Sequence, residues 1–169
     1  MKEPKNKAVN YDVVPKSHDA YEVLDRALNW HDELREAKIA LAWRKKLKAD
    51  VDGRIVLGRC HKISDLHKEF IPFDFVVVLN REYWEQFNDE QRIALMDHEL
   101  CHAAASLDPD SAEQKYDEKG RPCWRVRKHD IEEFREVVQR HGCYKADLEE
   151  FAKVLRSKSA NPLFSQAKA

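Results

Sequence analysis

The sequence contains few glycines, few cysteines and no long hydrophobic run. Of its 169 residues, 4 are glycine and 4 are cysteine. The cysteines, at positions 60, 101, 123 and 143, include no C-x-x-C pair, which excludes a cysteine zinc ribbon and predicts reduced thiols. No apolar stretch approaches the roughly 18 residues needed to cross a bilayer, and the N-terminus lacks the hydrophobic region of a signal peptide. We therefore expect a soluble protein of the cytoplasm.

An excess of charge of either sign is also absent. The formal net charge is −1, although 36% of the residues are charged and 43% are hydrophobic. This balance gives the whole protein no electrostatic attraction to nucleic acid or to a membrane surface. The length and the apolar fraction suit one compact domain with a heavily solvated surface.

Two short basic stretches are local exceptions to this balance. "WRKKLK" and "RPCWRVRK" each place a tryptophan, Trp43 or Trp124, among cationic side chains. Aromatic and cationic side chains together suit a single-stranded nucleic acid partner. A solvated strand edge with tryptophans in the core produces the same pattern, and the near-zero net charge favours that interpretation.

The hydrophobic spacing in the first half of the chain predicts one helix and several strands. A helical period predicts a helix from Asp19 to near Glu36, and a period of two after it predicts a strand that includes 39–43. Asp52-Gly53 predicts a hairpin turn. "RIVLGRCHKI" (54–63) carries the charges of an edge strand, whereas "FDFVVVLN" (73–80) is apolar on both faces and suits an inner strand.

The second half of the chain is predicted to be mainly helical. Asn88 and Gln91 have the spacing of a capping box, which predicts a helix from residue 89 to 106 or 107. Asp130 is the predicted N-cap of a further helix that ends at Gly142, and a last helix follows. The expected fold is α+β, with a small sheet packed against the N-terminal helix, the helix from residue 89 and the helix after Asp130. We expect a flexible arm over 1–17, one domain over 18–157 and a flexible tail over 158–169.

The stretch "ALMDHELCHAAA" (94–105) carries the clearest chemical signal. His98 and His102 are one helical turn apart, so their imidazoles share a face and can bind one zinc ion. Glu99 follows the first histidine and can act as the general base on a zinc-bound water. An amphipathic helix that carries two histidines by chance is the competing interpretation. The uncharged neighbours argue against it, because burying histidine and glutamate among them is costly without a role.

Tight zinc binding requires a third protein ligand, and several downstream residues are candidates. Asp108 has the spacing of one metzincin branch, but that pattern also requires a glycine at Ala105 and a later methionine, and both are absent. Glutamates after His129 would give a two-histidine, one-glutamate site, and His141 suits the C-terminal end of a helix. His129 is favoured because it immediately precedes the Asp130 cap. The set of alternatives to His129 is Asp108, Glu132, Glu133, Glu136 and His141.

"DHELCHAAASLD" followed by "WRVRKHDIEEFREVVQRHG" resembles the family described as putative phage metallopeptidases, which is similar to SprT-like zinc peptidases. The resemblance covers roughly residues 21–144. It implies a zinc-dependent peptidase fold and a third histidine ligand before a phenylalanine, which His129 and Phe134 of "HDIEEF" match. The loop before His129 is longer than in SprT-like proteins, and the zinc ribbon of some relatives is missing.

Two functions are compatible with these residues. The first is a single-domain zinc metallopeptidase that cleaves a peptide or protein substrate, in the cytoplasm of a bacterial host if the phage resemblance holds. The second is a zincin-like regulatory or binding module, similar to the ImmA/IrrE proteins of phages, that cleaves one specific partner or none. Association of such a module with DNA is a variant of this second hypothesis. A generic unfolded substrate separates the two, because a partner-specific module leaves it intact.

Overall fold

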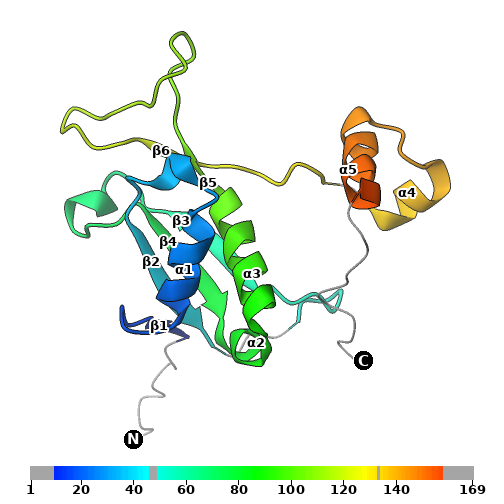
Figure 1. The fold of residues 1–169 in the computed structure, drawn as a ribbon, viewed down its shortest axis with the longest axis horizontal. Helices are drawn as coiled ribbons and strands as arrows, with labels where there is room; N and C mark the ends of the chain where they lie inside the picture. The colour runs from blue at the N-terminus through cyan, green and yellow to red at the C-terminus, as the bar shows by residue number, and fades with distance from the viewer. Residues whose placement is uncertain (1–9, 46–48, 133, 158–169) are drawn as a thin grey trace, which may run out of the picture. The chain divides into compact units, whose positions relative to one another are not determined.

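The computed structural model describes residues 10–45, 49–132 and 134–157. The chain divides into two compact units, Met1–Arg127 and Lys128–Ala169, where the sequence predicted one domain over 18–157. The fold class is α+β, as predicted (Figure 1). The expected tail at 158–169 and the first nine residues of the expected arm lie outside the described residues.

A four-stranded mixed sheet forms the centre of the first unit. Its strands lie in the order β1-β2-β4-β3, with β2 and β4 parallel and the other neighbours antiparallel. The bounds are β1 (Tyr11–Val13), β2 (Ile39–Arg44), β3 (Gly58–Lys62) and β4 (Phe75–Asn80). A separate antiparallel pair joins β5 (Ala103–Ala105) to β6 (Trp124–Val126).

Strand β1 corrects the prediction of a flexible arm over 1–17. Tyr11–Val13 pairs with β2, and the next residue, Val14, is buried. The backbone N–H of Val14 donates to the carbonyl oxygen of Leu41 at 3.0 Å. Pairing with β2 and burial of one valine therefore order a segment whose own composition is too polar to reveal a strand.

The described residues of the first unit form three α-helices and two 3₁₀ helices. They are α1 (Ala20–Leu28), η1 (Asp32–Leu34), η2 (His67–Glu69), α2 (Arg81–Gln86) and α3 (Asp89–Cys101). In Figure 1, α1 and α3 run side by side over one face of the sheet. Their inner faces and the strands form one core, whose largest fully buried side chains include Trp84, Trp124, Phe75 and Met96. The helix predicted from Asp19 to near Glu36 is thus shorter, and its last part is η1.

The arrangement of β2, β3 and β4 differs in part from the prediction. Strand β4 is an inner strand and β3 is an edge strand of the four-stranded sheet, as predicted. The predicted hairpin at Asp52-Gly53 is wrong in its pairing. Residues 50–54 do form a turn, in which Gly53 has φ +76°, but β3 pairs with β4 and not with β2. The valine-rich β4 occupies the central position because both of its faces can be buried.

Helix α3 begins where the capping box predicted and ends earlier. The Asn88 side chain accepts from the backbone of Gln91, and the Gln91 side chain accepts in return. The helix stops at Cys101 and not at residue 106 or 107, because Ala103–Ala105 pairs with β6 instead. His102 is therefore the C-cap residue of α3, at the point where the chain turns into a strand.

The second unit contains α4 (Arg135–His141) and α5 (Ala146–Ser157). The predicted N-cap at Asp130 is wrong, since α4 begins after Phe134; Glu133 lies outside the described residues. Gly142 ends α4 as predicted, with φ +67° and its N–H donating to the carbonyl of Val138 at 2.8 Å. Across the described residues of both units, no helix is long and apolar enough to span a bilayer.

Candidate metal centre

The last turn of α3 places two imidazoles together. His98 is exposed and His102 is half-buried, and their ring centroids lie 5.2 Å apart with an interplanar angle of 81°. This closeness follows from their spacing of four residues, which stacks side chains on one helical face. Two nitrogen donors one turn apart are the geometry from which a tetrahedral metal ion can be bound.

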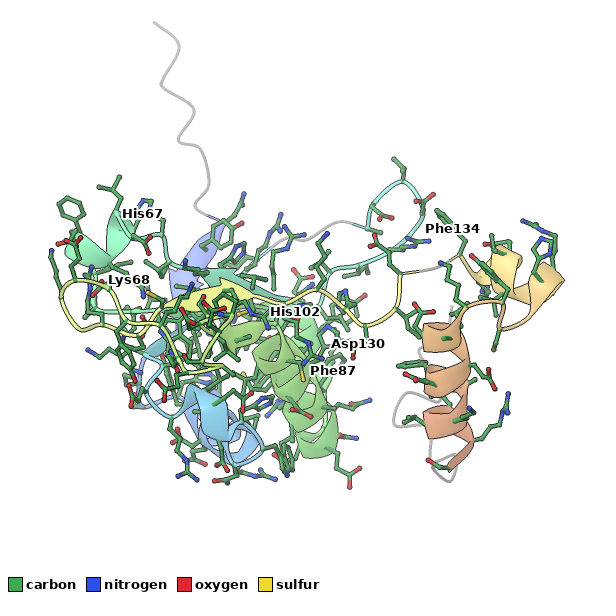
Figure 2. All side chains as sticks on the ribbon, turned by 90° about the horizontal axis from the view of Figure 1, so that it is seen from above. His67, Lys68, Phe87, His102, Asp130 and Phe134 are labelled. Carbon is green, nitrogen blue, oxygen red and sulfur yellow. The ribbon has the colours of Figure 1, made fainter. Side chains whose placement is uncertain are left out.

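The ring of His102 is oriented by the neighbouring strand. Its Nδ1 donates to the carbonyl oxygen of Arg127 at 2.8 Å, and the Arg127 N–H donates back to the His102 carbonyl at 2.7 Å. Both bonds continue the pairing of β5 with β6, and Figure 2 shows His102 at the end of α3. A proton fixed on Nδ1 leaves the Nε2 lone pair for a metal ion, the usual arrangement of histidine ligands.

Glu99 lies between the two histidines in the sequence. Its side chain is buried, with 3% of the residue's surface exposed. It faces β3, where its carboxylate accepts from the backbone N–H of Cys60. Its other oxygen, Oε2, is buried without a hydrogen-bond partner among the described residues. Burial raises the pKa of the Glu99 carboxyl, while His102, the Cys60 N–H and Arg59 act in the opposite direction. A buried carboxylate with one oxygen unsatisfied is suited to accept a hydrogen bond from a water molecule.

Gly58 leaves the space that Glu99 occupies. A Cβ atom added at Gly58 would lie 2.5 Å from Glu99 Oε1 and 2.8 Å from its carboxyl carbon, so any larger residue must displace the glutamate. The sequence patterns considered above did not predict this role of Gly58. The signal was present, because an isolated glycine within a strand pattern often marks close approach of another group.

The hydrogen-bonding pattern of β3 shows which of its backbone groups reach the open edge. Leu57 and Ile63 bond to β4, through Asn80 N–H and Asp74 carbonyl respectively. Since bonded and non-bonded residues alternate in an antiparallel pair, the backbone groups of Gly58, Cys60 and Lys62 point away from β4. The Cys60 N–H already donates to Glu99. Within the part of the chain that the structure describes, no strand pairs with this edge of β3, where the outward backbone groups of Gly58 and Lys62 lie on either side of Cys60.

The candidates for the third ligand occupy different surroundings. His129 is exposed, belongs to the second unit and follows Arg127 by two residues. Asp108 accepts from the backbone of Asp110 and Ser111 at 3.0 and 3.2 Å, so its carboxylate closes its own turn. The remaining candidates also belong to the second unit: Glu132 is exposed, Glu136 lies in the first turn of α4, His141 lies in its last turn, and Glu133 is outside the described residues.

The donor chemistry fits a zinc ion. His102 has the tautomer that a metal ligand needs, and the unpartnered Oε2 of Glu99 is a buried acceptor that a bound water would satisfy. The nearby Cys60 does not compete as a ligand or nucleophile. Burial, and then the charge of Glu99, raises the pKa of its thiol to about 12, so it stays protonated at neutral pH.

The tryptophans of the two basic stretches belong to the core. Trp43 and Trp124 are 5% and 1% exposed, so neither offers a ring face on which a base could stack. Arg125 is exposed on β6, while Lys46 and Lys48 lie outside the described residues. This is the arrangement of a solvated strand edge with core tryptophans, and a nucleic acid partner is not supported.

Comparison with known proteins identifies the family. The model of the family described as "Putative phage metallopeptidase" matches residues 11–159, which is most of the chain, and the chain belongs to that family. No curated protein and no solved structure matches. A family of this description implies a metal ion and a peptide or protein substrate.

Proposed function

We propose that this member of the phage metallopeptidase family hydrolyses peptide bonds with a zinc ion bound by His98, His102 and His129 and with Glu99 as the general base. The observation that carries the proposal is the buried Glu99 carboxylate, whose Oε2 lacks a partner among the described residues and which lies in the same helical turn as the oriented His102. The family match supports the peptidase activity in its coarse form.

His129 is the proposed third ligand because of where the chain leaves the first unit. Arg127 is hydrogen-bonded to His102 through both its N–H and its carbonyl oxygen. Consecutive Cα atoms are about 3.8 Å apart, so the Cα of His129 lies within about 7.6 Å of that of Arg127. The three histidines form one of the donor sets among the described residues that could hold a metal ion.

A third imidazole has a chemical advantage over a glutamate. Three neutral ligands leave the full +2 charge of zinc at the site, which favours ionisation of a bound water more than a carboxylate ligand would. Zinc bound in this way supplies a water of pKa about 7 and polarises the scissile carbonyl. The next residue, Asp130, has an exposed carboxylate, and a carboxylate next to a histidine ligand can orient the imidazole ring.

Glu99 holds the proton during the reaction. Its Oε1 side is fixed over Gly58 and by the Cys60 N–H, and its unpartnered Oε2 is the atom that accepts the proton of the attacking water. The same oxygen can then deliver the proton to the leaving amine. Burial, which raises the pKa of this carboxyl, brings it closer to the value that suits proton transfer near neutral pH.

The edge of β3 is the proposed docking site for the substrate backbone. An extended peptide can add to an open sheet edge through main-chain hydrogen bonds. Gly58 and Lys62 offer backbone groups at this edge on either side of Cys60, which is bonded to Glu99. A peptide that pairs there would pass directly beside the general base.

The test uses an unfolded substrate, reduced casein, with the zinc-loaded protein. We expect cleavage that a chelator abolishes and zinc restores, and a Glu99→Gln variant that keeps zinc but does not cleave. If the protein with zinc bound leaves casein and other unfolded chains intact, the general peptidase proposal fails. The partner-specific regulatory module then becomes the better description of the same site.

A further inference from the structure

Helix α3 carries a second pair of side chains whose chemistry suits a metal ion. Asp97 and Cys101 are also one turn apart, and each immediately precedes a histidine of the first pair. Successive residues of an α-helix are rotated by about 100°, so this pair lies on a neighbouring face. On that face it meets His31, which comes from the segment between α1 and β2.

We propose that His31, Asp97 and Cys101 bind a second divalent metal ion, of the zinc type, separate from the proposed catalytic centre. One donor atom from each of the three side chains lies within 4.8 Å of the other two. His31 Nε2 is 2.8 Å from Asp97 Oδ1. A tetrahedral zinc ion with bonds of about 2.0–2.3 Å holds its donors about 3.3–3.8 Å apart. Binding therefore requires the donor atoms of His31 and Asp97 to separate by about 0.5–1 Å, and a donor at the 4.8 Å limit to approach the other two by about 1 Å.

The surroundings of His31 prepare it to be a ligand. Its ring is buried, with 6% exposure, between two carboxylates, since Glu33 Oε1 lies 3.4 Å from Nδ1 on the side opposite Asp97. In the metal-bound state, the ring proton would lie on Nδ1 and donate to Glu33, and Nε2 would exchange its hydrogen bond to Asp97 for a bond to the metal ion. This is the carboxylate–histidine–metal arrangement found around zinc sites.

The charges and protons balance when the metal ion binds. Cys101 binds as a thiolate, so its thiol proton is released to solvent. Asp97 binds as a carboxylate and His31 as a neutral imidazole, so the two negative ligands, Asp97 and Cys101, cancel the +2 charge of the ion. The thiolate and imidazole donors favour zinc, or a similar borderline metal, over magnesium or calcium. Cys101 is exposed and Asp97 is half-buried, so the fourth coordination position is open to water.

A simple hydrogen bond between His31 and Asp97 is the competing explanation. It accounts for two of the three residues, because such a bond ties the segment before η1 to α3. It gives no reason for a third metal-binding side chain, Cys101, within 4.8 Å of both. A metal ion would fasten that segment to α3 directly beside His98 and His102, so its occupancy would stabilise the turn that carries them.

The test is spectroscopic and uses the full chain with cobalt(II) in place of zinc. A cobalt–thiolate bond gives a charge-transfer band in the near ultraviolet, and the three-histidine centre cannot produce one because it has no sulfur ligand. We expect the band in the unmodified protein and its loss in Cys101→Ser. Cys143→Ser is the matched control, since it makes the same change at an exposed cysteine of the second unit and should leave the band unchanged.

Two further variants keep the proposal falsifiable. Asp97→Asn, a change of nearly equal shape at a half-buried position, should weaken cobalt binding at this site at least tenfold. His98→Ala, which removes a proposed catalytic ligand, should leave the band in place, so the two metal-site proposals fail separately. Absence of the band in the cobalt-treated protein, its survival in Cys101→Ser, or unchanged affinity in Asp97→Asn would each overturn the second site.

Discussion

The two units of the chain differ in how their apolar residues are used. In the first unit, the sheet, α1 and α3 enclose a core that contains every buried hydrophobic residue of the described chain except Ala40 and Leu148. In the second unit, Leu148 is buried whereas Phe134, Phe151 and Leu155 are 69%, 48% and 62% exposed. The side chains of the first unit are therefore fixed by packing in a core, whereas the helices of the second unit have few buried apolar side chains.

The residues of the proposed centre come from both units. His98, Glu99 and His102 belong to the unit with a packed core, and His129 belongs to the unit with few buried apolar side chains. His98, Glu99 and His102 lie on a helix that packs in the core, and His102 is tied to Arg127. His129 comes just after the last residue of the first unit. We infer that the first unit determines the geometry of the base, and that the segment after Arg127 determines whether the third ligand is supplied.

The largest effect is expected from one amide substitution made in each unit. Glu99→Gln in the first unit should lower casein hydrolysis by roughly a thousandfold or more while zinc stays bound, because the amide cannot accept the water proton. Glu132→Gln in the second unit, at an exposed glutamate, should change the rate less than about twofold. Rates and zinc content are measured on the same samples. Zinc loss in Glu99→Gln would make Glu99 a ligand and not the base.

The stability of the two units should differ just as clearly. Trp124 is 1% exposed and packs its ring against Phe75 at 5.7 Å, so Trp124→Ala should lower the free energy of unfolding by about 3–5 kcal/mol. Phe151 in α5 is about half exposed, and Phe151→Ala should cost about 1 kcal/mol or less. Denaturant titration followed by tryptophan fluorescence and circular dichroism gives both values. Equal losses would show that α5 is packed as tightly as the sheet.

A glycine substitution tests whether β3 positions the base. Gly58→Ala should reduce hydrolysis about ten- to a hundredfold with zinc retained, because the added Cβ would lie 2.5 Å from Glu99 Oε1. Gly142→Ala is the control in the second unit, where a Cβ meets no atom within 4 Å although φ is +67°. The control should lose some stability and keep its activity. Full activity in Gly58→Ala would mean that Glu99 does not need its position over β3.

The smallest predicted effect concerns the edge of β3. Lys62→Pro removes one outward N–H without breaking a bond to β4, so KM for a peptide should rise about three- to tenfold with little change in kcat. Lys62→Ala keeps the N–H and serves as the control for the lost side chain. A KM that is equal in the two variants would exclude this part of the edge from substrate binding.

The sequence was most informative where local chemistry determines structure. The capping box at Asn88 and Gln91, the turn at Gly142 and the apolar β4 could be predicted because each depends on neighbouring residues or on burial of both faces. The end of α3 and strand β1 could not, because both depend on partners distant in sequence. Ala103–Ala105 has no strand pattern of its own and becomes β5 through pairing with Trp124–Val126.

In the candidate site too, the features set by neighbouring residues could be predicted from the sequence, and those set by distant partners could not. The spacing of His98, Glu99 and His102 predicted a shared helical turn, and α3 carries all three at its end. The partners that orient them are backbone groups from other elements, namely the Arg127 carbonyl and the Cys60 N–H. Every residue type except proline has both groups, so the amino-acid sequence alone gives no sign of which ones are used.

The central claim is that the third ligand is His129, and zinc content of three purified proteins tests it most directly. Zinc is measured per chain by plasma emission after dialysis in the unmodified protein, in His129→Ala and in Glu132→Ala, with folding checked by circular dichroism. We expect His129→Ala to hold about one zinc fewer per chain than the unmodified protein, and Glu132→Ala to hold the same amount. Retention of zinc in His129→Ala with loss in Glu132→Ala would contradict the claim and assign a two-histidine, one-glutamate centre.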